Sequence, residues 1–226
     1  MGAACVGRRR RRAVARENRC PRAAAALHDD GMPYKIPNVV EPGTLAGQEQ
    51  PTLAASGGLI LRAWSPKDAP AVYEAFQDPA LQRWHARVAD SEDEAREWIE
   101  DWRAAWAKER AATWAVADAD TGEVAGRVAL REINLGDGQA EMAYWTMPRA
   151  RGRGVAPRAV TALAGWALDV VGLHRLELYH ATANEASCRV ALKTGFVAEG
   201  VKRSAVLHED GWHDMHLHAR IRGDAT

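Results

Sequence analysis

The sequence has little cysteine, little phenylalanine and no long hydrophobic run. Its 226 residues include three cysteines, Cys5, Cys20 and Cys188, and two phenylalanines. An odd number of widely spaced cysteines argues against a disulfide framework and against a zinc knuckle. No stretch approaches the roughly 18 apolar residues of a membrane helix, and no apolar signal segment follows the basic amino terminus. We therefore expect a cytoplasmic protein in a reducing compartment, without a membrane partner.

The formal net charge is zero, but the charge is distributed unevenly. Residues 1–31 contain eight arginines and three acidic residues, a net charge of +5, so the remainder carries −5. A mildly acidic folded part argues against a specific nucleic-acid partner. The five arginines at 8–12 would suit a nucleic acid or a membrane surface, but such runs more often bind nothing specific. We assign this run no partner.

Composition divides the chain near residue 58. Residues 1–58 are rich in Arg, Ala, Pro and Gly and have no sustained periodicity. They predict an N-terminal tail that is largely disordered or extended. Met32 is an alternative start of translation, and the extended segments after it could pack on the body. Residues 59–222 have regular hydrophobic periodicity, which predicts one globular domain.

Within this domain, period and capping signals predict an alternation of strands and helices. Ser91 and Glu94 have the spacing of a capping box, and Pro157 and Gly172 bracket another helix. The elements predict a mixed α/β domain with an antiparallel three-stranded meander and one strand–helix–strand crossover. We expect strands at 59–64, 113–119, 123–133, 139–147, 174–182, 196–207 and 211–221, and helices at 65–78, 91–110, 155–171 and 184–194.

The segment RARGRGVA (149–156) lies between a predicted strand and a predicted helix. A helix start presents unpaired N–H groups and attracts phosphate, and Gly152 and Gly154 allow the backbone to turn those groups inward. The segment lacks the Lys-Ser/Thr of a Walker loop, and Pro157 interrupts the dinucleotide fingerprint. It predicts a different phosphate-binding loop, made mainly of backbone N–H groups with arginine side chains at its rim.

The pattern Arg149-x-x-Gly152-x-Gly154 resembles the pyrophosphate motif of the GCN5-related N-acetyltransferases (GNAT). The predicted element order over 59–221 also matches this family. AEMAYWTMPRARGRGVAPRAV and HRLELYHATANEASCRVALKTGFVAEG are most similar to its RimJ/RimL-type subgroup of N-terminal and ribosomal-protein acetyltransferases. The resemblance implies a GNAT fold with a mostly antiparallel, splayed central sheet flanked by helices. It also implies acetyl-CoA as cosubstrate and no metal.

The resemblance assigns the cofactor-binding positions. In the family, the end of the strand before the loop pairs with pantetheine and the loop carries pyrophosphate. A backbone N–H is expected to meet the oxyanion. The matching residues are Trp145, Thr146 and Met147 for pantetheine, Arg149, Arg151, Gly152, Arg153, Gly154, Val155 and Ala156 for pyrophosphate, and Asn184 for the pantetheine arm.

Ser187 is the candidate acid. It lies three residues after Asn184 at the start of a predicted helix, so the two share nearly one face. In the subgroup the matching Ser is suited to protonate the coenzyme A thiolate. Many other GNAT enzymes have a Tyr where this chain has Ala191, which favours Ser187. The plain alternatives are an ordinary N-cap for Asn184 and an ordinary first-turn serine.

Glu141, on the strand before the loop, is the leading candidate base for the attacking amine. The alternative is a solvent-facing strand carboxylate. RimL-type enzymes can carry a Glu base ten residues after Phe196, where this chain has Val206. That departure weakens the specific inference of a ribosomal-protein acceptor and leaves His208 and Asp210 as weaker substitutes.

The acceptor side is predicted less specifically. Trp98, Trp102 and Trp106 recur at helical spacing, which is most often a core stripe. The functional interpretation is that Trp102, with Trp84 and His85 in the preceding loop, lines the substrate-binding site. The acceptor is an amine, either a peptide N-terminus or a small molecule, and a homodimer is left open.

His213, Asp214, His216 and His218 gather near the carboxyl end, and on a strand Asp214, His216 and His218 share one face. We expect no metal, because acetyl transfer needs none. Cys188 is interpreted as a small core residue. The alternative functions are transfer of another acyl group such as succinyl, an antibiotic-detoxifying acetyltransferase, and a non-catalytic acyl-CoA sensor.

Overall fold

A computed structural model describes residues 36–85 and 87–224. Its centre is an eight-stranded sheet of order β1-β2-β3-β4-β5-β6-β8-β7. All neighbouring strands pair antiparallel except β5 and β6, which are parallel. The strands are β1 (Leu53–Ala55), β2 (Leu59–Ala63), β3 (Ala112–Asp118), β4 (Val124–Asn134), β5 (Gln139–Thr146), β6 (Arg175–Ala181), β7 (Val197–His208) and β8 (Gly211–Ile221).

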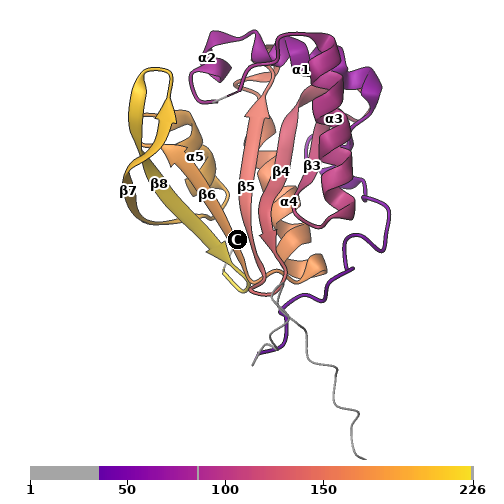
Figure 1. Ribbon diagram of the computed structural model, residues 1–226, viewed down its shortest axis with the longest axis vertical. Coiled ribbons are helices and arrows are strands. Elements are labelled where there is room, and N and C mark those ends of the chain that lie inside the picture. Colours follow the sequence, from indigo (N-terminus) through magenta and orange to yellow (C-terminus); the bar gives the residue numbers. More distant parts are fainter. Residues whose placement is uncertain (1–35, 86, 225–226) are drawn as a thin grey trace, which may run out of the picture. The chain divides into compact units, whose positions relative to one another are not determined.

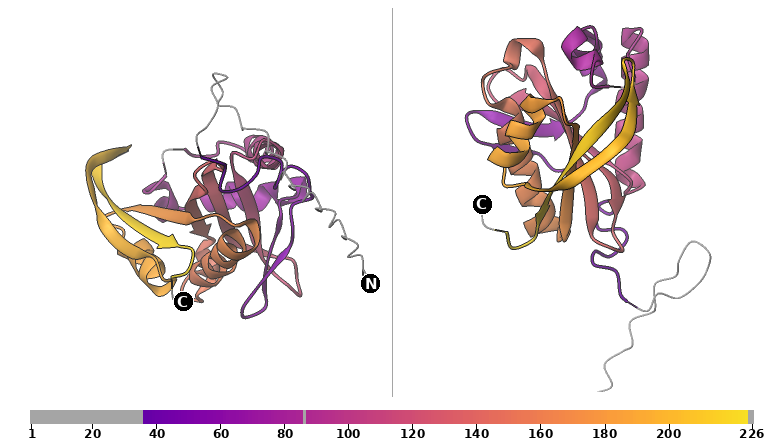
Figure 2. Two further views of the ribbon diagram at one scale, coloured as in Figure 1. Left: turned by 90° about the horizontal axis from the view of Figure 1, so that it is seen from below. Right: turned by 90° about the vertical axis from the view of Figure 1, so that its left-hand side faces the viewer.

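Helices cover both faces of this sheet (Figures 1 and 2). Helices α1 and α3 lie on one face, and α4 and α5 lie on the other. The mixed α/β architecture and the mostly antiparallel sheet confirm the predicted fold class. The helices are α1 (Ala69–Phe76), α2 (Pro79–Gln82), α3 (Glu92–Ala107), α4 (Val155–Gly165) and α5 (Glu185–Lys193).

The sheet splays between β5 and β6 (Figure 1). These two strands pair only over Gln139–Glu141 and Arg175–Glu177. Beyond that point they diverge, so the end of β5 has a neighbour only on the β4 side. The predicted splay is therefore present, and it opens a gap in the middle of the sheet.

The tryptophan stripe of α3 belongs largely to the core. Trp98 and Trp106 are buried, and Trp106 packs edge-on against Trp114 at 5.9 Å between ring centroids. Ser91 caps α3 by accepting a hydrogen bond from the Glu94 N–H. The Glu94 carboxylate accepts a hydrogen bond from the N–H of Asp90. A capping box would have it accept from the N–H of Ser91, so the second bond of the box forms one residue earlier than predicted.

The expected tail over 1–58 is wrong for residues 38–58, which belong to the folded unit. Val40 and Leu45 are buried, and β1 pairs with β2. The Glu109 carboxylate accepts hydrogen bonds from the backbone of this segment at Gly43 and Leu45, both at 2.6 Å. Periodicity missed it because a distant side chain, and no local pattern, orders it. The pentaarginine run, Cys5, Cys20 and Met32 lie outside the described residues.

Three further differences concern helix ends. The predicted helix 65–78 is a 3-10 turn over Pro66–Asp68 followed by α1, which has Pro70 in its first turn. The predicted helix 155–171 is α4 followed by a π-helix over Trp166–Val171, which ends at Gly172 with a φ of 90°. The predicted loop after residue 78 contains α2, where the Asp78 carboxylate accepts a hydrogen bond from the Leu81 N–H.

Candidate active site

The glycine-rich turn before α4 has the geometry of an anion nest. Gly152 and Gly154 have φ values of 73° and 72°, in the left-handed region that glycine adopts without strain. A Cβ at Gly152 would meet nothing within 4 Å, so backbone conformation, and not crowding, calls for glycine there. In the described part of the chain, the N–H groups from Gly152 to Ala156 have no acceptor. They are free to hold an anion.

The arginines around this turn have different roles. Arg149 donates to Glu123 and Glu74, at 2.7 and 2.8 Å, and is not among the residues that line the neighbouring cavity. Arg151 does line the cavity and forms an ion pair with Asp78. Arg153 is exposed and outside the lining. Of the three predicted rim arginines, only Arg151 is therefore positioned toward the cavity.

Arg158, which the sequence pattern did not single out, stabilises the turn from α4. Its guanidinium donates to the carbonyls of Gly154 at 3.0 Å, Arg153 at 2.7 Å and Gly57 at 3.2 Å. By occupying these carbonyls it orients the loop with its N–H groups outward. The signal for it was its position four residues after Gly154, one helical turn away.

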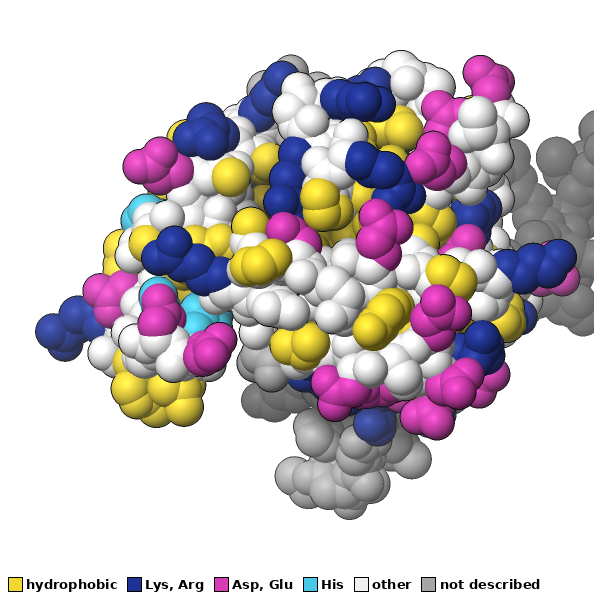
Figure 3. All heavy atoms as spheres, turned by 90° about the horizontal axis from the view of Figure 1, so that it is seen from above, with side chains coloured by type: hydrophobic (Ala, Val, Ile, Leu, Met, Phe, Trp, Pro, Cys, Tyr) yellow, Lys and Arg dark blue, Asp and Glu magenta, His cyan; other side chains and the backbone are white. Residues whose placement is uncertain are grey.

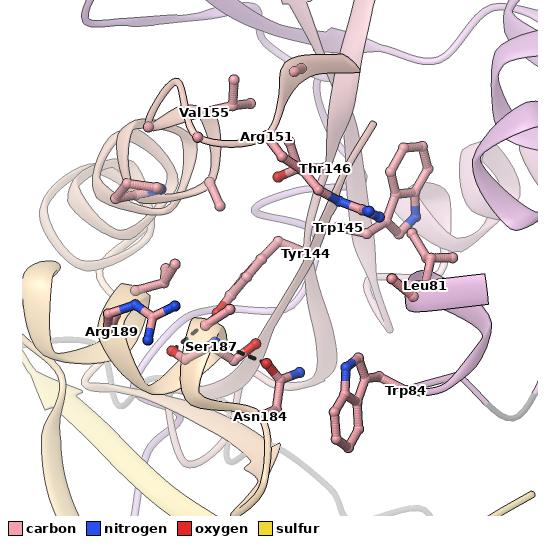
Figure 4. A pocket seen from close by; sticks show the side chains of 18 of the residues that line it. Leu81, Trp84, Tyr144, Trp145, Thr146, Arg151, Val155, Asn184, Ser187 and Arg189 are labelled. Carbon is pink, nitrogen blue, oxygen red and sulfur yellow. Dashed lines mark hydrogen bonds between the residues drawn. The ribbon is translucent and has the colours of Figure 1, made fainter. Parts of the chain in front are cut away.

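A cavity of about 630 Å³ lies between this turn, α5, the end of β5 and α2 (Figure 4). Figure 3 shows a face of the molecule on which lysine, arginine, acidic and hydrophobic side chains lie around a hollow. Of the residues that the resemblance assigns to the cofactor, Trp145, Thr146, Val155, Ala156 and Asn184 line this cavity. Met147 does not, because it is fully buried and its N–H donates to the Ala125 carbonyl at 2.9 Å.

A second cavity of about 510 Å³ lies on the other side of α5's first turn and contains Glu141. The two cavities share five lining residues, which means that they meet along one wall. This wall contains Trp84 and His85, which were predicted to line the acceptor site. It also contains Asn184 and Ser187, which were predicted at the start of α5. The shared residues are Trp84, His85, Tyr144, Asn184 and Ser187.

Asn184 positions Ser187 within this wall. The Asn184 side-chain oxygen accepts a hydrogen bond from the Ser187 N–H at 3.1 Å, so Asn184 is the N-cap of α5 as well as a cavity residue. Tyr144 lies opposite, and its hydroxyl donates to the Ser187 carbonyl at 3.4 Å (Figure 4). Burial raises the pKa of Tyr144 to about 12, so it keeps its proton at neutral pH.

Sequence reasoning missed Tyr144. It lies on β5 between the predicted residues Glu141 and Trp145, but simple alternation assigns it to the opposite face from both. The splay exposes this end of β5, so side chains from both faces reach the cavities. Leu81 and Arg189 were also missed, because they come from a short helix and from the outer face of α5.

Glu141 is half-buried in the second cavity, and Arg131 lies 3.7 Å away. Burial raises the pKa of the Glu141 carboxyl above its ordinary value, and Arg131 opposes this shift. A raised pKa brings a carboxylate closer to the operating range of a general base. His85 is the contrasting neighbour, because burial together with Arg127 and Arg131 lowers its pKa to about 4. Its ring is therefore neutral at neutral pH.

Arg127 lines neither cavity but is close enough to His85 to lower its pKa, and its guanidinium stacks on Trp102, 4.8 Å from the ring centroid. Over residues 36–85 and 87–224 no carboxylate pairs with it. Burial and the nearby Arg131 lower its pKa to about 10, so it remains charged. Trp102 lines neither cavity. Its ring packs against the Arg127 guanidinium instead, and its contact with the substrate stays a prediction.

The β7–β8 hairpin reaches the loop after α2. Trp84 lies edge-on to His208 and His213, at 6.1 and 6.0 Å between ring centroids. His208 lines the second cavity, whereas Asp210 pairs with His213 at 2.6 Å. Val206, in the place of the RimL-type base, also lines this cavity. The two segments on which the acceptor side depends are thus in contact.

The splayed sheet, the glycine-rich turn before α4 and the joined cavities are together the arrangement of an acetyltransferase domain. The sequence model of the acetyltransferase (GNAT) domain family matches residues 58–197. The chain belongs to this family and is an N-acetyltransferase enzyme that acts on an amine acceptor. Members of the family use acetyl-CoA.

Individual relatives place it near the RimJ/RimL-like subgroup. The N-acetyltransferase YoaA of Bacillus subtilis, itself uncharacterized, is 26% identical over 165 residues, 73% of this chain and 93% of that protein. The ribosomal-protein-serine acetyltransferase of Escherichia coli is 30% identical over 99 residues, 44% of this chain and 55% of that protein. These matches confirm the predicted family and subgroup.

The fold is also that of a solved structure. RimL, a ribosomal L7/L12 alpha-N-protein acetyltransferase in complex with coenzyme A, superposes with a TM-score of 0.71 at 22% identity. The superposition covers 77% of this chain and 100% of that one. No helix in the described part of this chain is both long and apolar enough to cross a bilayer.

Proposed function

We propose that the protein transfers the acetyl group of acetyl-CoA to a primary amine by direct attack in a ternary complex. The larger cavity takes the donor and the smaller one takes the acceptor. The observation that carries this proposal is the shared wall, because a reaction between two bound substrates requires their sites to meet at the reacting atoms. Ser187 and Tyr144 lie in that wall.

The donor side is assigned to backbone groups. The free N–H groups from Gly152 to Ala156 bind the pyrophosphate, and Arg151 adds charge at the rim. The unpaired edge of β5 at Trp145 and Thr146 binds the pantetheine arm, with Asn184 across the gap. A backbone N–H at this edge polarises the thioester carbonyl.

The chemistry needs one proton to leave the amine and one proton to reach the departing sulfur. Acetyl-CoA supplies the activated thioester. Glu141 accepts the amine proton, directly or through a water, and its raised pKa suits this role. The C–S bond breaks as the C–N bond forms, and the Ser187 hydroxyl donates a proton to the thiolate. Tyr144 presents a second hydroxyl at the same wall.

The charges around the smaller cavity favour one class of acceptor. Arg131 and Lys202 line it, Arg127 lies close to its lining residue His85, and Glu141 is the carboxylate among its lining residues. Such a site disfavours a polycation. Its bases are also weak, which suits an α-amine with a pKa of about 7.7–8.0 better than a side-chain amine near 10.4. We therefore propose a peptide or protein N-terminus over a polyamine or an aminoglycoside.

Steady-state thiol release tests this function. Full-length protein would be assayed with acetyl-CoA against N-terminal peptides, spermidine and an aminoglycoside in parallel, and with succinyl-CoA as a second donor. We expect turnover with acetyl-CoA and a peptide, with the acetyl group located on the α-nitrogen by mass spectrometry. Preferred turnover of the aminoglycoside would favour the detoxifying alternative, and a preference for succinyl-CoA would favour the other acyl transferase.

A further inference from the structure

Three histidines lie together on one face of the sheet, away from the phosphate loop. His180 on β6 is directly opposite His216 on β8 in the strand register, and His218 follows two residues further on the same face. The ring centroids are 5.2 Å apart for His180 and His216, and 5.1 Å for His180 and His218. His180 and His218 are buried.

Helix α5 adds a sulfur to this group. A potential ligand atom from each of Cys188, His180, His216 and His218 lies within 4.8 Å of all the others. Tetrahedral zinc, with Zn–N of about 2.0–2.1 Å and Zn–S of about 2.3 Å, needs ligand atoms roughly 3.3–3.7 Å apart. The Nε2 atoms of His180 and His218 are 3.1 Å apart, and the other ligand atoms need to approach one another by at most about 1.5 Å.

Hydrogen bonding alone leaves these rings poorly satisfied. His180 Nδ1 lies 2.9 Å from the Ala181 carbonyl and must carry a proton to bond it, which leaves a bare lone pair on Nε2. His218 Nε2 must then donate to it. Among the described residues, His216 Nδ1 is buried without a hydrogen-bond partner. A cation among the rings would take up the lone pair of His180 Nε2 and give His216 a partner.

The sequence pattern had suggested a different set, with Asp214 beside His216 and His218. The structure excludes Asp214, whose carboxylate accepts a hydrogen bond from the Ser204 N–H at 2.8 Å. His180 and Cys188 take its place. A donor set of imidazoles and a thiolate selects borderline or soft transition metals over Mg²⁺ or Ca²⁺. The second group, His208, Asp210 and His213, is explained by its own ion pair.

We propose that His180, Cys188, His216 and His218 form a zinc-type metal site that fastens α5 to β6 and β8. Four protein ligands fill a tetrahedral shell, so the site is structural and leaves no position for a substrate. Its position gives it a second consequence. Cys188 follows Ser187 directly, and Asn184 is one helical turn earlier, so the metal fixes the part of α5 that borders both cavities.

Cobalt spectroscopy tests the ligand set without reference to activity. Full-length protein would be stripped with EDTA and titrated with Co²⁺, which replaces Zn²⁺ in tetrahedral sites. We expect intense visible d–d bands and a near-ultraviolet thiolate-to-cobalt charge-transfer band. Cys188→Ser should remove the charge-transfer band, and His218→Gln should weaken binding by at least about tenfold. His213→Ala, which alters the neighbouring group, should leave the spectrum unchanged.

Thermal unfolding provides the second readout. At a hundredfold excess over its dissociation constant, Zn²⁺ should raise the Tm of the stripped protein by about 5–10 °C. The Cys188→Ser protein should lose most of that rise, and near-ultraviolet circular dichroism of the metal-free variants would verify that they are folded. A charge-transfer band that survives Cys188→Ser would assign the metal to Cys5 or Cys20 and overturn the proposal. So would the absence of Co²⁺ binding at neutral pH.

Discussion

The two cavities share a wall but differ in the groups that line them, since backbone N–H groups dominate one end of the larger cavity and side chains line the smaller one. At one end, the larger one is formed by backbone N–H groups of one continuous turn, Gly152 to Ala156, and by the start of α4. The smaller one is lined by side chains from β4, β5, β6, the loop after α2, the start of α5 and the β7–β8 hairpin, and eight of its seventeen lining residues titrate or carry charge. Both cavities join distant segments, but the anion nest at one end of the larger cavity is a local structure, and the smaller cavity has no such local part.

In the function proposed above, this difference separates the groups that bind the cosubstrate from the groups that select the acceptor. A backbone nest tolerates almost any side chain that keeps the two left-handed glycines, so it can persist while the rest of the domain varies. The acceptor cavity depends on Arg127, Arg131 and Glu141, whose charges can be changed one at a time. The proposed variants therefore act on the donor side through geometry and on the acceptor side through charge.

The largest expected effect is on the donor side. Gly154→Trp should lower acetyl-CoA affinity by at least about a hundredfold, since it adds a side chain at the nest and strains a left-handed backbone. Isothermal calorimetry measures this directly. Gly122→Trp is the matched control, because Gly122 has a φ of 73° and open space around it and lies outside both cavities. Equal affinity in the Gly154 variant would refute the nest.

The next effect lies in the shared wall. Ser187→Ala should lower kcat by about 10²-fold, because the thiolate would leave without its proton donor, while the KM for acetyl-CoA changes little. Tyr144→Phe is the companion variant and removes the other hydroxyl. If kcat falls only in the Tyr144 variant, the proton donor is Tyr144 and the assignment of Ser187 is wrong.

A smaller effect is expected from the base. Glu141→Gln should lower kcat by about tenfold, because an α-amine is already partly deprotonated at neutral pH. In the parent protein, kcat at saturating substrates should rise with pH as Glu141 ionises. Its raised pKa places that rise above the ordinary carboxyl value of about 4.3. In Glu141→Gln this rise of kcat with pH should disappear. If the rise persists unchanged, a residue other than Glu141 is the general base.

Arg127 tests the charge of the acceptor cavity. Arg127→Met keeps an apolar side chain on Trp102 and removes the guanidinium, so the KM for a peptide with an acidic second residue should rise about fivefold. The kcat/KM for spermidine should not fall. Arg103→Met, an exposed substitution on α3, is the control. A peptide KM that stays constant would remove Arg127 from acceptor selection.

The smallest functional effect is expected outside both cavities. Burial raises the pKa of Glu109, but the backbone donors of Gly43, Ala46 and Leu45 outweigh it, and the net pKa is lowered. This carboxylate therefore stabilises the fold above its unfolded pKa, and the gain is lost as pH falls through the lower folded value. Glu109→Gln should cost about 1–2 kcal/mol in urea unfolding without changing acetyl-CoA affinity. Glu100→Gln, on the exposed face of α3, should cost less.

The sequence locates more of the residues that line the larger cavity than of those that line the smaller one, and the reason is physical. The glycines, the following helix and the N-cap Asn184 are encoded within short segments, so spacing alone locates them. Tyr144 reaches the cavities because β5 and β6 splay, and the orientations of Arg149 and Trp102 depend on partners 25 or more residues away. The packing of residues 38–58 depends likewise on Glu109. The spacing of residues within a short segment does not predict contacts with residues that are distant in the sequence.

A conjugate of coenzyme A with a peptide α-amine would test the central claim most directly, because it must occupy both cavities at once. Calorimetry would compare its affinity with that of acetyl-CoA in the parent protein and in Arg127→Met. If the cavities meet at Ser187 as described, the conjugate should bind at least about tenfold more tightly, and Arg127→Met should remove much of that gain. A conjugate that binds no more tightly than acetyl-CoA would contradict the assignment of the two cavities to donor and acceptor.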